Sequence, residues 1–113
     1  MDTRSFADEW QQDWNSHDLD RIMAHYRDDV IFRSNKAVAL VGTGEIHGKA
    51  DLRAYWKIAL DQQKELRFKV QDVLVGYRMA VITYTNHRGT LAAETLVFDE
   101  DGQVFLAAAC HEV

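Results

Sequence analysis

The sequence contains no proline and only one cysteine, Cys110. A lone cysteine cannot form an intramolecular disulfide, so the fold must be stabilised by its hydrophobic core. Without proline, the turns must be built from glycine, asparagine and aspartate. No apolar run approaches the roughly 18 residues of a membrane-spanning helix, and the first residues lack the apolar segment of a secretion signal. These absences predict a protein of the reducing cytoplasm.

Positive charge is also scarce and scattered along the chain. Thirteen Lys and Arg residues stand against 18 Asp and Glu residues, which gives a net charge of −5. We therefore expect neither a nucleic acid nor an anionic membrane as a partner. With 113 residues, the chain is predicted to form one domain, residues 1–113, that can bury about two thirds of its unfolded surface.

Apolar residues recur at helical spacing in three segments, which predict three helices. The first spans residues 2–15, the second runs from a cap at residues 16–18 to residue 26, and the third spans residues 50–63. A short strand at 30–35 and a glycine-containing loop at 36–48 separate the second helix from the third. The apolar stripes consist of Phe6, Trp10 and Trp14; of Leu19, Ile22, Met23 and Tyr26; and of Leu52, Tyr55, Trp56, Ala59 and Leu60.

After the third helix the pattern changes to strands. Four β-rich runs, 66–77, 79–87, 90–98 and 103–112, are joined by short connections that predict an antiparallel meander. Because the helices precede the meander instead of alternating with it, the fold class is α+β, with the helices packed in a curved, mainly antiparallel sheet.

The tight connections also predict a register. A two-residue turn at Arg88-Gly89 would pair Thr83 with Glu94, and a turn at 99–102 would pair Glu94 with Ala107. Directly paired residues share a face of the sheet. The concave face would then have apolar side chains at one end and small side chains in the middle, where alanine and threonine leave space beside one carboxylate.

Glu94 and His111 are the candidate catalytic residues of this concave face. A carboxyl group that faces an apolar cavity has a raised pKa, which suits a general acid or base. A histidine near a carboxylate can relay protons at neutral pH. The simpler interpretations are a hydrogen bond or ion pair of Glu94 to a neighbour such as Thr83, and a solvated His111 at a frayed strand end.

A metal site is not predicted. His87, His111 and Glu94 are suitable ligand types, but two rows of the predicted sheet, ~13 Å of strand rise, separate Glu94 from the histidines. The other three histidines, at 17, 25 and 47, are expected at the surface or in helix caps. No phosphate loop or nucleotide fingerprint is present, so no cofactor is expected.

The opposite face of the predicted sheet is too apolar to remain fully exposed to solvent. Bent strands could bury part of it, but we favour a homodimer formed through these outer faces. Its residues would be Ile82, Tyr84, Ala93, Thr95, Val97, Leu106, Ala108 and Cys110.

Three stretches, WNSHDLDRIMAHYRDDVIF, IHGKADLRAYWKIAL and AAETLVFDEDGQV, together with the last strand, resemble the nuclear-transport-factor-2-like superfamily. The similarity covers nearly the whole chain and is greatest to the SnoaL-like and ketosteroid-isomerase-like branches. It implies a cone-shaped α+β fold, in which the last strand often contributes pocket-lining residues such as His111. It does not imply one activity, because the fold includes isomerases, cyclases, dehydratases, epoxide hydrolases and non-enzymatic binders.

The ketosteroid-isomerase-like resemblance can be carried over residue by residue. The oxyanion-hole tyrosine of that branch corresponds to Trp10, its general-base aspartate to Ser34, and its protonated carboxylic acid to Glu94. Indole is not an acid, and a serine hydroxyl does not act unaided as a base at neutral pH. Only Glu94 keeps a suitable group, so isomerisation of steroids by the familiar set of residues is disfavoured.

The sequence thus predicts a small-molecule protein with an apolar pocket. The favoured function is cofactor-free acid/base isomerisation, cyclisation or dehydration of a hydrophobic carbonyl compound. A non-catalytic carrier of a lipophilic ligand and a dimerisation module without a ligand remain as alternatives. The predicted pocket residues are Glu94, His111, Trp10, Phe32, Ser34, Tyr55, Thr83 and Ala109.

Overall fold

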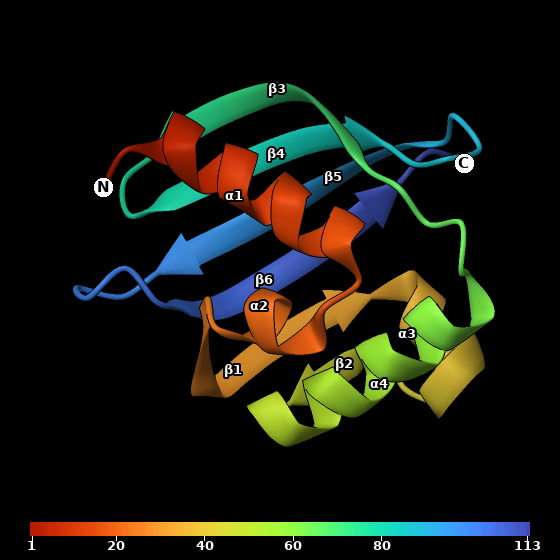
Figure 1. Cartoon of the computed structure of the whole chain (residues 1–113). Coiled ribbons are helices and arrows are strands. Elements are labelled where there is room, and N and C mark those ends of the chain that lie inside the picture. Colours follow the sequence, from red (N-terminus) through yellow and green to blue (C-terminus); the bar gives the residue numbers. More distant parts are fainter.

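The computed structural model describes residues 1–113, with four helices packed on one six-stranded sheet (Figure 1). This arrangement confirms the predicted α+β fold class. The helices are α1 (Thr3–Ser16), α2 (Leu19–Met23), α3 (Asn35–Val41) and α4 (Lys49–Gln62). The strands are β1 (Tyr26–Ser34), β2 (Glu45–His47), β3 (Lys69–Gly76), β4 (Met79–Thr85), β5 (Leu91–Phe98) and β6 (Val104–His111).

The strands lie in the order β2-β1-β6-β5-β4-β3. Strands β3 to β6 form the predicted antiparallel meander. Strand β1 pairs in parallel with β6 and antiparallel with β2, so the sheet is mainly antiparallel. No helix of the structure is both long enough and apolar enough to cross a membrane.

Two predicted elements of the first half need correction. The second helix ends at Met23. Tyr26 is the first residue of β1, and its side chain is fully buried there. The segment predicted as a loop with one short extended piece contains α3 as well as the short strand β2. No residue in the run 35–41 breaks a helix, and α3 ends only at Gly42, which adopts a left-handed φ of 81°.

Helix α1 is positioned by caps at both ends. Asp2 accepts a hydrogen bond from the backbone N–H of Ser5 at 3.2 Å. His17 ends the helix in a left-handed conformation, and its N–H donates to the carbonyl of Trp14. The prediction of His17 as a capping residue is therefore confirmed, and the aromatic stripe between the caps faces the sheet.

An aromatic layer fills the space between the helices and the sheet. Trp10 stacks on Phe68 with ring centroids 5.6 Å apart and meets Tyr84 edge-on at 5.0 Å. Trp14 meets Trp56 of α4 edge-on at 4.9 Å. Such edge-to-face and stacked pairs add about 0.5–1.5 kcal/mol each to the burial of their apolar area. This layer holds α1 and α4 at fixed positions over the strands.

The predicted register of β4 is wrong by one residue. The connection to β5 is a five-residue loop, 86–90, because the side chain of Asn86 accepts hydrogen bonds from the N–H groups of Arg88 and Thr90. Thr85 consequently pairs with Leu91, and Ile82 pairs with Glu94. A shift of one residue exchanges the faces of a strand, so Ile82 and Tyr84 lie on the concave face and were wrongly assigned to the outer one.

The β5–β6 register differs from the prediction by two residues, which preserves the faces. Glu94 pairs with Ala109, not with Ala107. Three successive rows of the concave face lie next to Glu94, beyond the row of Tyr26, Val104 and Phe98. From the closed end they are Phe32, Ala107, Leu96 and Ala80; then Ser34, Ala109, Glu94 and Ile82; then His111, Ala92 and Tyr84.

Candidate functional site

A cavity of about 100 Å³ lies between the concave face of the sheet, α1 and α4. Eleven of its 17 lining residues are hydrophobic, and the aromatic layer supplies much of its wall. Six residues predicted from the sequence for the pocket surround this cavity. They are Trp10, Phe32, Ser34, Tyr55, Glu94 and Ala109.

Glu94 is the central polar group of the cavity. Its side chain is 3% exposed and forms no ion pair. Its one hydrogen bond comes from the Tyr84 hydroxyl, which donates to Oε1 at 3.2 Å; this distance is long for an O–H···O bond. Oε2 has no partner in the protein, so it is the atom left available to a ligand.

Burial raises the pKa of Glu94 from its ordinary value of 4.5 to about 8, and the Tyr84 hydrogen bond offsets only part of this effect. The cause is desolvation, because an ionised carboxylate loses its hydration in an apolar site. At neutral pH the carboxyl group is therefore mainly protonated. A protonated carboxyl group can donate a hydrogen bond or a proton, which an ionised one cannot do.

Three tyrosines surround Glu94. Burial, followed by the proximity of the Glu94 carboxyl, raises the pKa of Tyr84 and that of Tyr26. Burial also raises the pKa of Tyr55, and the nearby Ser34 hydroxyl partly offsets this rise. The phenols of Tyr84 and Tyr55 line the cavity and remain protonated, so they too are donors. The Tyr26 hydroxyl is fully buried and has no hydrogen-bond partner.

Ser34 ends β1 and precedes α3 without capping it, since its side chain forms no hydrogen bond to the helix. It is 7% exposed and lies in the same row of the sheet as Ala109 and Glu94. The two small residues leave the space of the cavity between β1 and β5. The concave face therefore has small residues in its middle, as predicted, although the register of the strands differs from the prediction.

His111 does not line the cavity. It lies on the concave face, paired with Ala92, one row closer to the open end than Ala109 and Glu94. Its Nδ1 is 2.9 Å from the carbonyl oxygen of Glu112. Because a carbonyl only accepts, Nδ1 carries the proton of this bond, and Nε2 has no partner in the protein.

Thr83 was wrongly placed beside Glu94. In the observed register it pairs with Ala93 on the outer face, where its hydroxyl accepts a hydrogen bond from the backbone N–H of Asp72 at 2.9 Å. Tyr84, which takes the place next to Glu94, was not among the predicted pocket residues. The larger apolar residues of β4, Ile82 and Tyr84, alternate with Val81 and Thr83, and this alternation could have indicated the correct face.

Comparisons with known proteins identify the family and the fold. A family model for the SnoaL-like domain matches residues 7–112. The chain belongs to the SnoaL-like domain family. The superfamily resemblance predicted from the sequence is thereby confirmed. No protein with a curated description is similar in sequence to this SnoaL-like chain.

Solved structures of SnoaL-like and related proteins share the fold. A SnoaL-like protein of unknown function from Burkholderia thailandensis E264 is 35% identical, with a TM-score of 0.92 over 98% of this chain and 95% of the other. An NTF2-like protein of unknown function from Burkholderia pseudomallei K96243 is 15% identical, with a TM-score of 0.79 over 99% and 92% of the two chains. TerC, co-crystallised with polyporic acid, is 12% identical, with a TM-score of 0.79 over 97% and 91%.

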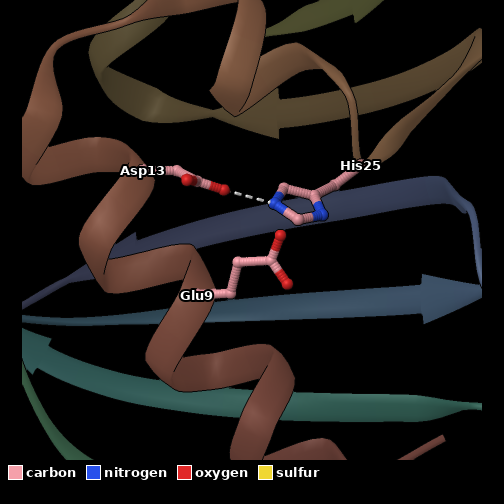
Figure 2. Close-up of side chains that lie close together, drawn as sticks. All are labelled: Glu9, Asp13 and His25. Atoms are coloured by element: carbon pink, nitrogen blue, oxygen red, sulfur yellow. Dashed lines mark hydrogen bonds and ion pairs between the residues drawn. The ribbon is translucent and has the colours of Figure 1, made fainter.

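A second polar cluster of this SnoaL-like chain lies outside the cavity, where Glu9 and Asp13 of α1 meet His25 (Figure 2). Candidate ligand atoms of the three residues lie within 4.8 Å of one another. Asp13 is 4% exposed and binds His25 Nε2 at 2.6 Å and the Arg21 guanidinium at 3.0 Å. Both Asp13 oxygens are thus occupied by donors, and Arg21 already supplies the positive charge that a metal ion would bring.

The cluster therefore joins α1 to α2 and to the start of β1. His25 was expected at the surface or in a cap, and the structure corrects this expectation, because its ring pairs with a buried carboxylate and packs edge-on against Phe6. The spacing of Glu9 and Asp13, one helical turn apart, was visible in the sequence. Their partner on another element was not.

The raised pKa of Glu94 predicts a pH-dependent stability. Below pH 4.5 the carboxyl group is protonated in both the folded and the unfolded chain, so its ionisation does not change the free energy of unfolding. Between pH 4.5 and about 8 only the unfolded chain ionises, and the native chain loses up to about 1.4 kcal/mol of stability per pH unit. Relative to Glu94→Gln, the native chain should therefore become less stable from pH 5 to pH 8, as measured by urea unfolding.

The matched control is Glu100→Gln, since Glu100 is exposed in the turn between β5 and β6. This variant should follow the native chain over the same pH range. If the stability difference between the native chain and Glu94→Gln stayed constant with pH, the Glu94 carboxyl group would not be desolvated.

Proposed function

We propose that this SnoaL-like chain binds a small hydrophobic carbonyl compound and catalyses its cofactor-free isomerisation, cyclisation or dehydration. The observation that supports this proposal is a buried carboxyl group on the wall of an apolar cavity, with one free oxygen and no cation beside it. Keeping such a group unpaired costs folding free energy. A carboxylic acid held neutral at pH 7 can act on a substrate oxygen.

In the proposed reaction, Glu94 donates its proton to the substrate carbonyl oxygen while His111 Nε2, directly or through a water molecule, accepts a proton from the adjacent carbon, which forms an enol. The enol O–H then returns its proton to Glu94, and the proton held by His111 goes either to a different carbon, which gives an isomer, or to a neighbouring hydroxyl group, which leaves as water. The Tyr84 hydroxyl holds the Glu94 carboxyl group in place. His111 has a free Nε2 on the same face, towards the open end, and assists by accepting the carbon-bound proton or by orienting the substrate.

A non-catalytic carrier is the second candidate function. Glu94 is the one carboxyl or imidazole group that lines the cavity, and acid/base catalysis commonly needs both a proton donor and an acceptor. TerC, which shares the fold at 12% identity, was crystallised with polyporic acid, and a bound acid is compatible with either function. A dimerisation module without a ligand does not need the cavity, which at about 100 Å³ is smaller than the roughly 300 Å³ or more of a drug-sized ligand's pocket and suits only a small molecule.

Glu94→Gln separates the enzyme from the carrier. The amide keeps the size and a hydrogen-bond donor but cannot transfer a proton, so turnover should fall at least ~100-fold while ligand affinity changes little. A suitable substrate is 3-cyclohexen-1-one, because its conversion to the conjugated ketone is followed by ultraviolet absorbance. Binding of the conjugated ketone is measured in parallel, and Glu100→Gln is the control.

The pH profile gives an independent readout. Since the protonated form of Glu94 is the active one, kcat/KM should fall above pH about 8. Binding without turnover in the native chain would favour the carrier, and equal turnover in Glu94→Gln would exclude Glu94 as the proton donor.

We also propose that two copies associate through the outer face of the sheet. Helices α1, α2 and α4 lie on the other side (Figure 1), and the outer residues of β4, β5 and β6 are uncharged. After the register correction they are Val81, Thr83, Ala93, Thr95, Val97, Leu106, Ala108 and Cys110. Leu106 is 38% exposed at this face. An uncharged, largely apolar face can pair with the same face of a second copy.

Light scattering at micromolar concentration tests this association. The native chain should have the mass of a dimer, and Thr95→Arg should have that of a monomer, because a buried pair of like charges opposes docking. Gln12→Arg, at an exposed position of α1 on the opposite side of the sheet, is the control. A monomeric native chain would exclude the dimer.

A further inference from the structure

The open end of the cavity is formed by three segments that are distant in the sequence. They are the first turn of α3, the end of α4 and the loop between β4 and β5, which gather at one end of the sheet (Figure 1). The polar lining residues that they supply are Lys36, Gln63, Asn86 and Thr90. This end differs from the apolar interior of the cavity, so a ligand that fits both must have a polar and an apolar part.

Lys36 is the one cationic residue that lines the cavity. It is exposed and takes part in none of the ion pairs of the structure. Five other basic residues pair with acidic neighbours, in a chain that has more acidic than basic residues. The three N–H groups of the Lys36 ammonium are therefore available to a ligand.

The Asn86 side chain presents a second donor at the same opening. Its Oδ1 accepts hydrogen bonds from the backbone N–H groups of Arg88 at 2.9 Å and Thr90 at 3.0 Å. These two bonds fix the orientation of the amide, because only an oxygen can accept both. The Asn86 NH₂ group is left without a partner in the protein.

No negative charge opposes these donors within the cavity. Glu94 is the one acidic residue of the lining, and desolvation raises its pKa to about 8. At pH 6–7 the cavity therefore contains a cation at its opening and a neutral carboxyl group in its interior. The lining attracts an anion locally, although the whole chain has a net charge of −5.

The size of the cavity limits the apolar part of the ligand. Its volume is about 100 Å³, and a cavity of about 150 Å³ accommodates benzene. The cavity is smaller than that, so a single ring would fill it and extend into its open end. The walls include Trp10, Trp14, Trp56 and Phe68, whose flat faces and edges favour a planar ring.

We propose that the cavity selects a one-ring organic acid, with its anionic group held by Lys36 and Asn86 and its ring enclosed by the aromatic walls. A cyclic keto acid would satisfy both ends, because its carbonyl oxygen would meet the Glu94 carboxyl group. This inference rests on the proposed function in that both use the same cavity, and it adds the charge and the size of the substrate.

Benzoate and its uncharged analogue benzamide are the probes, titrated at pH 6 and low salt. All three tryptophans line the cavity, so their indole N–H signals in ¹H–¹⁵N NMR spectra report binding at this site. We expect benzoate to bind at least ~5-fold more tightly than benzamide, and its affinity to fall when NaCl is raised from 20 to 500 mM.

Lys36→Met keeps the length of the side chain and removes its charge. It should weaken benzoate binding by roughly fivefold and change benzamide binding less than twofold. The matched control is Lys49→Met. Lys49 also starts a helix and forms no ion pair, but it does not line the cavity and lies at the end of α4 away from Gln63. This variant should bind both probes like the native chain.

The outcomes separate this inference from the proposed function. Equal binding of benzoate and benzamide, or an unchanged preference in Lys36→Met, overturns the anion selectivity and leaves the carbonyl-binding cavity intact. Binding of neither probe, with no shift of the indole signals at millimolar concentration, overturns both. Benzoate binding with Lys36-dependent selectivity but without turnover of any ketone supports the inference and favours the carrier.

Discussion

The desolvation of one carboxyl group determines the chemistry of this molecule. Glu94 lies on the concave face, closed off from water by α1 and α4, and a single long hydrogen bond from Tyr84 is its only partner. Because neither a cation nor a set of backbone N–H groups stabilises the ionised form, the proton stays on the carboxyl group at neutral pH. Proton donation, pH-dependent stability and the absence of repulsion towards anions all follow from this one condition.

The rest of the fold maintains that condition. The aromatic stripe of α1 packs on Phe68 and Tyr84, and Trp56 of α4 packs on Trp14 and Phe32. These large rings hold the helices away from the sheet, while Ser34 and Ala109 are too small to fill the space below them. A cavity remains beside Glu94 because bulky residues form the walls and small residues form the floor.

Much of this architecture could be predicted from the sequence. The periodic stripes of α1 and α4 and the switch to strand periodicity near residue 66 are strong local signals, and they led to the correct fold class. The inward position of Glu94 also followed, because the β5–β6 register was wrong by two residues and an even shift preserves the faces. The faces of β4 were reversed, because the side chain of Asn86 stabilises a five-residue loop where a two-residue turn was expected.

Interactions between distant segments were not predictable in the same way. The pairing of Asp13 with His25 and Arg21 depends on how α2 and the start of β1 return to α1. That Lys36 lines the same cavity as Asn86 and Gln63 depends on the position of α3, a helix that was not predicted in this glycine-containing segment. Residue types alone indicated a carboxyl group in an apolar pocket, but the tertiary fold determines which donors accompany it.

The most direct test is an NMR titration of the side-chain carboxyl carbon of Glu94, with the Glu94→Gln spectrum to assign its signal. A desolvated Glu94 carboxyl group should titrate with a midpoint at about pH 8. A midpoint near 4.5, the ordinary value for glutamate, would contradict this desolvation, because the carboxyl group would then be ionised and hydrated at neutral pH.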